Sequence, residues 1–160
     1  SFDARHSSIG KVYEYRFRLN ERNVEEINRV TFLEMKGFSM SLFKEALSKF
    51  VGVHDFRNFT TKDDDNEGFA REIREIKVVK KDKDLYSVYI EANHFMRYMV
   101  RMIIGTCFKV AYKKLDMSKI DELLSSKDYR AISYKAPADG LYLVEVKYAS
   151  NWLLFSYAYL

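Results

Sequence analysis

Cysteine, proline and long apolar runs are scarce in this sequence of 160 residues. The single cysteine, Cys107, excludes an intramolecular disulfide, and Cys/His clusters with zinc-ligand spacing are missing. We therefore expect no metal site and a reducing, cytoplasmic location. One proline and six glycines leave few interior boundaries, which predicts a single domain. Residues 102–108 are uncharged but far shorter than the roughly 20 apolar residues of a membrane-spanning helix, so we expect no membrane anchor.

Aromatic and charged residues are abundant instead. With 12 Phe, 12 Tyr and 48% hydrophobic residues, the chain has enough apolar mass for a core, which excludes a disordered protein. The balance of 27 Lys and Arg against 23 Asp and Glu gives a net charge of +4, which favours an anionic partner only slightly. The sequence begins at Ser1 without a methionine, so we expect a piece of a longer protein.

Hydrophobic periodicity predicts an α+β fold. Alternation with period two indicates strands, and apolar residues at i, i+3, i+4 and i+7 indicate helices. Ser39 is expected to cap the first helix at its amino end and Gly52 at its carboxyl end. The predicted elements are a strand at 11–19, a helix at 40–51, a hairpin of 71–81 with 85–92, helices at 95–113 and 118–125, and a strand at 141–148. This order favours a mainly antiparallel sheet with helices packed on one face.

Two polar features carry little functional weight. The run at 62–67 is interpreted as an exposed loop, because its residues do not follow the ligand order of an EF-hand. Cys107 falls on the apolar face of the predicted long helix, so we expect an inert buried thiol rather than a nucleophile.

A histidine and two arginines are predicted to share one stripe of the long helix. His94, Arg97 and Arg101 are spaced at i, i+3 and i+7. Like charges one turn apart repel each other, so this spacing favours a phosphate or a carboxylate between them. The alternative is a pair of arginines that extend into solvent from a core helix.

The first strand offers a second candidate surface. Lys11, Tyr13 and Tyr15 share one face of that strand, and Arg5 and His6 precede it. Aromatic rings beside a cation can stack on a base and bind its phosphate. Packing within the core or across strands is the alternative for either tyrosine.

Four motifs occur in one order and cover nearly the whole chain. They are Phe2-Asp3-Ala4-Arg5-His6-Ser7 with Lys11-Val12-Tyr13-Glu14-Tyr15, Gly52-Val53-His54-Asp55-Phe56 with Phe59, the segment 93–105 that contains Met99-Val100-Arg101, and Ala136-Pro137-Ala138-Asp139-Gly140-Leu141-Tyr142-Leu143. Together they resemble the tRNA pseudouridine synthase TruA family. The resemblance implies isomerisation of uridine to pseudouridine in the anticodon stem-loop of tRNA, without cofactor or metal, by a homodimer.

The resemblance also implies roles for individual residues. Tyr13 matches the active-site tyrosine, which is expected to stack on the target base and assist proton removal. Arg101 matches an arginine that is expected to pair with the catalytic aspartate and help extrude the base. Leu141 matches an apolar residue that lines the pocket. The candidate RNA-binding residues are therefore Tyr13, Leu141, Arg5, Lys11, Arg97 and His94, with Arg101 as the supporting catalytic residue.

One expected motif has no match. The nucleophilic aspartate of the family lies in an Arg-Thr-Asp-x-Gly-Val-His-Ala motif of an N-terminal half. Asp55 belongs to a different motif of the family. Residues 1–160 are thus interpreted as the C-terminal domain of such a synthase, inactive alone. The alternatives are a non-catalytic module that binds structured RNA, or a dimerisation unit that uses the apolar tail at 152–160 and a sheet edge.

Overall fold

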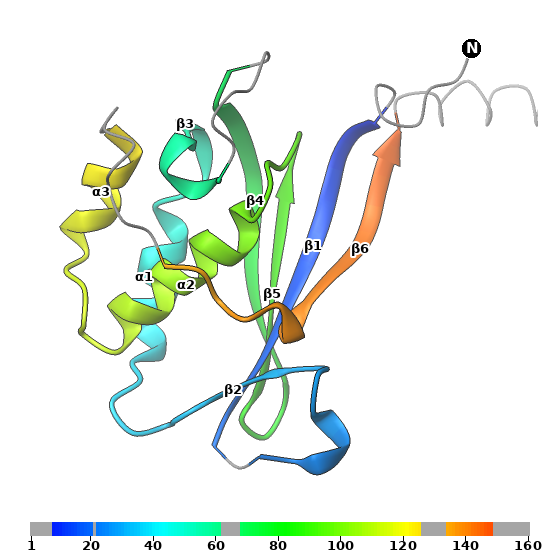
Figure 1. Cartoon of the computed structure of the whole chain (residues 1–160), viewed down its shortest axis with the longest axis vertical. Helices are drawn as coiled ribbons and strands as arrows, with labels where there is room; N and C mark the ends of the chain where they lie inside the picture. The colour runs from blue at the N-terminus through cyan, green and yellow to red at the C-terminus, as the bar shows by residue number, and fades with distance from the viewer. Residues whose placement is uncertain (1–7, 21, 62–67, 126–133, 149–160) are drawn as a thin grey trace, which may run out of the picture.

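A six-stranded sheet with helices on one face forms the framework of the chain (Figure 1). The computed structural model describes residues 8–20, 22–61, 68–125 and 134–148. The strands are β1 (Ser8–Leu19), β2 (Thr31–Leu33), β3 (Gly52–Asp55), β4 (Ala70–Asp82), β5 (Leu85–Ala92) and β6 (Leu141–Tyr148). Their order is β2-β1-β5-β4-β3, and β6 pairs with the amino-terminal part of β1. All pairings are antiparallel except β1 with β2, which confirms the predicted α+β class.

The helices lie together on one side of the sheet (Figure 1). They are α1 (Met40–Ser48), α2 (Met99–Ala111) and α3 (Ser118–Ser125), with 3₁₀ turns η1 (Val24–Glu26), η2 (Arg57–Phe59) and η3 (Ala138–Gly140). The predicted amino-terminal cap of α1 is confirmed, because the Ser39 hydroxyl accepts the Leu42 N–H at 3.2 Å. The predicted carboxyl-terminal cap is wrong: α1 ends at Ser48, and Gly52, with φ of 109°, begins β3.

The predicted long helix starts four residues too early. Helix α2 begins at Met99, and the preceding Tyr98 has a left-handed backbone conformation with φ of 62°. A helix cannot run through such a residue, so 95–98 form a loop between β5 and α2. Apolar Phe95 and Met96 still pack on the core from this loop, which is why the helical pattern extends beyond the helix.

An aromatic cluster joins the sheet to the helices. Phe17 of β1 contacts Phe43 of α1 and Phe108 of α2, with ring centroids 5.3 Å apart in each pair. Full burial of such a side chain contributes about 1.5–3 kcal/mol to stability. Cys107 is completely buried in the same core, which confirms its predicted burial, and burial raises the pKa of its thiol, as expected for a thiol of low reactivity.

Residues 134–137, called the strap below, cross α2 and lead through η3 into β6 (Figure 1). The Ala136 N–H donates to the Arg101 carbonyl at 2.8 Å, and the Arg101 Nε donates to the Ala136 carbonyl at 2.7 Å. At the crossing point stands Gly105, where a Cβ atom would lie 2.1 Å from the Tyr134 carbonyl oxygen. The strap can therefore touch α2 only because residue 105 has no side chain.

The other end of the strap is attached to β1. The Tyr15 hydroxyl donates to the Pro137 carbonyl at 2.6 Å and lies 2.7 Å from the Thr31 hydroxyl. Tyr15 is completely buried, and burial is the main cause that raises its pKa to about 12. The acidic run at 62–67 and the apolar tail at 152–160 lie outside the described residues.

We predict that Gly105→Ala destabilises the protein, although alanine normally stabilises a helix by about 1 kcal/mol relative to glycine. The new methyl group would overlap backbone atoms of Tyr134 and Ala136, which have no flexible end to move aside. Overpacking of this kind costs about 1–3 kcal/mol, measurable as a lower urea midpoint. A raised midpoint would contradict the close contact between the strap and α2.

We also predict a loss of stability at high pH that depends on Tyr15. Its pKa is near 12 when folded and near 10 when unfolded, so above pH 10 the unfolded chain releases the proton first and the folded state loses stability. At pH 11 this loss amounts to about 1 kcal/mol. Tyr15→Phe removes this titration. The difference in free energy of unfolding between wild type and variant should therefore become smaller from pH 9 to pH 11, as measured by denaturant titration. A constant gap would contradict the buried, protonated phenol.

Candidate nucleobase pocket

Tyr13, Arg97, Arg101 and Leu141 all line one pocket of about 320 Å³. Tyr13 comes from β1, Arg97 from the loop before α2, Arg101 from α2, and Leu141 from the start of β6. The remaining lining residues are Phe95, Met96, Tyr98, Met99, Val100 and Ala138. The pocket volume falls within the range of sites for small organic groups, and aromatic and aliphatic walls with a few polar groups are typical of such sites.

Tyr13 forms one wall of the pocket. It is partly exposed, and Phe95 packs edge-on against it with ring centroids 4.9 Å apart and an interplanar angle of 83°. Burial raises the pKa of the Tyr13 phenol, so the side chain is neutral at physiological pH. Tyr13 therefore presents an aromatic face and a protonated hydroxyl rather than a phenolate.

Leu141 faces the pocket because of the register between β1 and β6. Leu141 is paired with Tyr15, and Leu143 with Tyr13, so all four side chains belong to the same face of the sheet. Tyr15 lies under the helices in the core, which assigns it a structural position rather than a place in a stacking surface. Of the two tyrosines, only Tyr13 reaches the pocket.

Arg101 lies in the first turn of α2 with its guanidinium held in place. Its Nε is bonded to Ala136 of the strap, and its Cζ lies 5.4 Å from the centroid of the Tyr98 ring. Within the described part of the chain no carboxylate forms an ion pair with Arg101. Its remaining donors are thus available to an anion in or beside the pocket.

Tyr98 stands where the loop meets α2, surrounded by positive charge. Arg97 places its Cζ 4.9 Å from the ring centroid and donates from Nη2 to the Tyr98 hydroxyl at 3.2 Å. Lys135 of the strap places its Nζ 4.2 Å from the same centroid. The hydrogen bond from Arg97, followed by the positive charges of Arg97 and Lys135, lowers the pKa of the Tyr98 phenol. The left-handed conformation costs a non-glycine residue about 1–2 kcal/mol, so the surrounding contacts must stabilise it.

The predicted stripe of His94, Arg97 and Arg101 does not exist as a helical stripe. Only Arg101 is in α2, because the helix begins at Met99. His94 is exposed and does not line the pocket, and its backbone N–H donates to Asn93 Oδ1. Arg97 reaches the pocket from the loop instead.

The other predicted binding residues are placed less centrally. Lys11 is on the same face of β1 as Tyr13 but does not line the pocket. Arg5 and His6 lie outside the described residues. Sequence reasoning did not assign Phe95, Tyr98 or Lys135 to the site. Two features of the sequence could have pointed to them: Tyr98 directly follows Arg97, and Lys135 directly precedes the Ala136-Pro137 motif.

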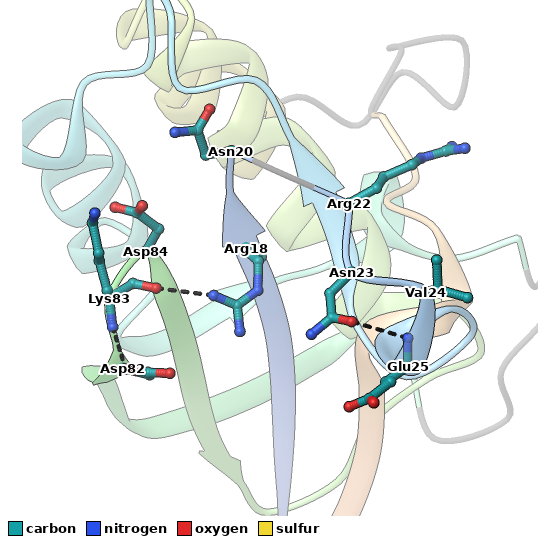
Figure 2. A pocket seen from close by; sticks show the side chains of 9 residues that line it. All are labelled: Arg18, Asn20, Arg22, Asn23, Val24, Glu25, Asp82, Lys83 and Asp84. Atoms are coloured by element: carbon teal, nitrogen blue, oxygen red, sulfur yellow. Dashed lines mark hydrogen bonds between the residues drawn. The ribbon is translucent and has the colours of Figure 1, made fainter.

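A larger hollow of about 740 Å³ lies near the carboxyl end of β1 (Figure 2). It is lined by Arg18, Asn20, Arg22, Asn23, Val24, Glu25, Asp82, Lys83 and Asp84. Arg18 is already bonded to the Glu26 carboxylate and to the Lys83 carbonyl, and Figure 2 shows that the lining side chains do not converge on one point. The smaller pocket at Tyr13 therefore has the more specific chemistry.

Among the described residues, no group of three or more His, Cys, Asp or Glu side chains is arranged to hold a metal ion. In the same ranges, no helix combines the length and the apolar composition needed to cross a membrane.

Comparison with known proteins identifies the family. Residues 46–149 match the family model described as tRNA pseudouridine synthase. The chain is 37% identical over 149 residues to tRNA pseudouridine synthase A of Ureaplasma parvum serovar 3, and 31% identical over 157 residues to that of Lactococcus lactis subsp. lactis. These alignments cover 92% of this chain, but only 59% and 58% of the respective relatives. By the family match and by these identities, the chain belongs to the tRNA pseudouridine synthase family.

Proposed function

We propose that this chain forms the RNA-binding and pocket-forming part of an enzyme that isomerises uridine to pseudouridine in the anticodon arm of tRNA. One observation carries the proposal. Tyr13, Arg101 and Leu141, which the family motifs single out from distant parts of the sequence, line the same pocket. Their convergence supports a shared role in holding one substrate group.

The pocket suits a uridine that has left its base stack. Extruding a base from structured RNA costs a few kcal/mol, and stacking on an aromatic side chain contributes about 1–3 kcal/mol per base. In the proposed arrangement the uracil ring lies against Tyr13, with Leu141 as the opposing apolar contact. Arg101 stabilises the extruded state from the α2 side.

The reacting carboxylate is proposed to come from another part of the protein. Breaking and remaking the bond between base and sugar requires a carboxylate that acts directly on the uridine. No Arg-Thr-Asp-x-Gly-Val-His-Ala motif occurs in the 160 residues, and the chain spans about 59% of the length of the relatives that it matches. Both facts support a C-terminal domain whose Arg101 pairs with an aspartate supplied by the N-terminal half.

Tyr13 is proposed to act mainly through its ring and its neutral hydroxyl. The raised pKa leaves little phenolate at physiological pH, so the residue is suited to relay a proton rather than to remove one as a strong base. This assignment retains the expected stacking role and limits the expected role in proton removal.

The proposal is tested by a pseudouridine assay on an unmodified tRNA transcript. We compare the 160-residue chain with the same chain joined to the sequence that precedes it in its gene. Product should form only with the joined protein. Product from the 160-residue chain alone would contradict the proposal that the reacting carboxylate comes from another part of the protein. Tight tRNA binding by the joined protein without product would contradict the enzyme and favour a non-catalytic RNA-binding module.

In the joined protein, Tyr13→Ala should lower the rate of pseudouridine formation by about 10- to 100-fold, because one stacking contact is lost. Affinity for tRNA should change much less, since phosphate contacts dominate it. Tyr13→Phe keeps the ring and reports the contribution of the hydroxyl separately. Tyr89→Ala is the matched control, because Tyr89 is on the opposite face of the sheet. Equal losses in Tyr13→Ala and Tyr89→Ala would contradict the assigned pocket.

A further inference from the structure

Three cations from three segments surround the ring of Tyr98. Arg97 belongs to the loop before α2, Arg101 to α2 and Lys135 to the strap. Their charged groups lie 4.9, 5.4 and 4.2 Å from the ring centroid. Favourable contacts between each cation and the ring explain why the side chains gather there, but they do not neutralise the charge.

None of the three cations is paired with an acidic group within the described ranges. Elsewhere in those ranges arginines do find carboxylates, as Arg18 does with Glu26 and Arg57 with Asp55. Arg97 and Lys135 are also exposed, so their donors face solvent. An unpaired group of positive charges at the mouth of a pocket attracts an anion.

The cluster is held in place by backbone contacts on both sides. Lys135 lies between Tyr134, whose N–H donates to the Thr106 hydroxyl at 3.4 Å, and Ala136, which is bonded to Arg101. Tyr98 is held by its carbonyl, which accepts the Met102 N–H at 2.9 Å. The backbone at Tyr98 and Lys135 is therefore held in place before any ligand arrives, which lowers part of the entropic cost of binding.

We propose that Arg97, Tyr98 and Lys135 form a platform that binds a backbone phosphate of the RNA whose base occupies the pocket. This inference rests on the proposed function and adds a contact to it. Arg97 and Tyr98 line the pocket and Lys135 contacts the Tyr98 ring from outside its lining, so the platform lies at the rim of the pocket. A nucleotide carries a phosphate on each side of its sugar, so one of them lies near the rim when the base is inside. In the proposed function Arg101 pairs with the catalytic aspartate, which leaves Arg97 and Lys135 as the phosphate contacts.

RNA is favoured over an acidic protein because the platform adjoins an aromatic pocket rather than an extended groove. The Arg97 guanidinium offers several donors in one plane, which matches the oxygens of a phosphate, and the Lys135 ammonium adds a second positive charge. An aromatic ring beside these two cations also suits the sugar and base of a neighbouring nucleotide.

The experiment measures binding of an unmodified tRNA transcript by the joined protein between 50 and about 200 mM KCl. The test variant is the double change Arg97→Gln/Lys135→Gln. Lys44→Gln/Lys113→Gln is the matched control, because it removes the same charge from two exposed lysines that do not line the pocket.

Each lost phosphate contact reduces the slope of log K against log salt by about 0.7–0.9. The test variant should therefore lose about 1.4–1.8 from the slope, the control variant should lose little, and Lys135→Arg should retain the wild-type slope.

Several results would overturn the platform. Equal slope changes in the test and control variants would reduce it to an effect of net charge. An equal loss of polyglutamate binding in the test variant would reassign it to acidic chains. If the wild-type joined protein forms pseudouridine but the test variant keeps the wild-type slope of log K against log salt, the platform is rejected and the proposed function is kept. If the test variant loses the expected slope but the wild-type joined protein forms no pseudouridine, the platform is kept and the enzyme is rejected.

Discussion

The contact between the strap and α2 fixes the relative positions of the residues that line the pocket. The backbone and the guanidinium of Arg101 are both bonded to Ala136, and the absence of a side chain at Gly105 lets the two segments touch. The strap continues through η3 into β6, so this contact also determines where Leu141 lies. Tyr15 ties the same segment to β1, two residues from Tyr13. The backbone of this site is therefore held by packing and hydrogen bonds between the strap, α2 and β1.

The distribution of charge around the pocket favours an anionic partner. Positive groups gather at the rim of the pocket, and no described carboxylate neutralises them. In the proposed enzyme two anions approach from different directions: a carboxylate meets Arg101, and an RNA phosphate meets Arg97 and Lys135. The neutral phenol of Tyr13 lines the same pocket as Arg97 and Arg101, where a base can stack without opposing a negative charge. Affinity and catalysis would then depend on separate groups within one small region.

Much of the fold was predictable because it follows local rules. Period-two alternation located β1, the β4–β5 hairpin and β6, and a capping serine located the start of α1. Strands β2 and β3 were missed because three or four residues are too short to show a period. The start of α2 was wrong because the left-handed Tyr98 interrupts the helix while the apolar pattern continues into the loop.

The site was predictable only in part. Tyr13, Arg101 and Leu141 were assigned through the resemblance to a family, since no spacing rule relates residues so far apart in the chain. Lys135 and Tyr98 escaped prediction because their proximity depends on the strap crossing α2, which is a long-range contact with no local sequence pattern. The helical stripe was predicted from the correct residue types, but His94 and Arg97 precede the start of α2. Arg97 reaches the pocket from the loop before that helix.

The most direct test of the central claim is a crystal structure of the longer protein bound to an anticodon-arm RNA. The account predicts a uracil ring extruded from its stack and lying against Tyr13 and Leu141, with a backbone phosphate within hydrogen-bonding distance of Arg97 or Lys135. A bound RNA whose bases all stay stacked, or that lies along the hollow at residues 18–25 and leaves the Tyr13 pocket empty, would contradict it.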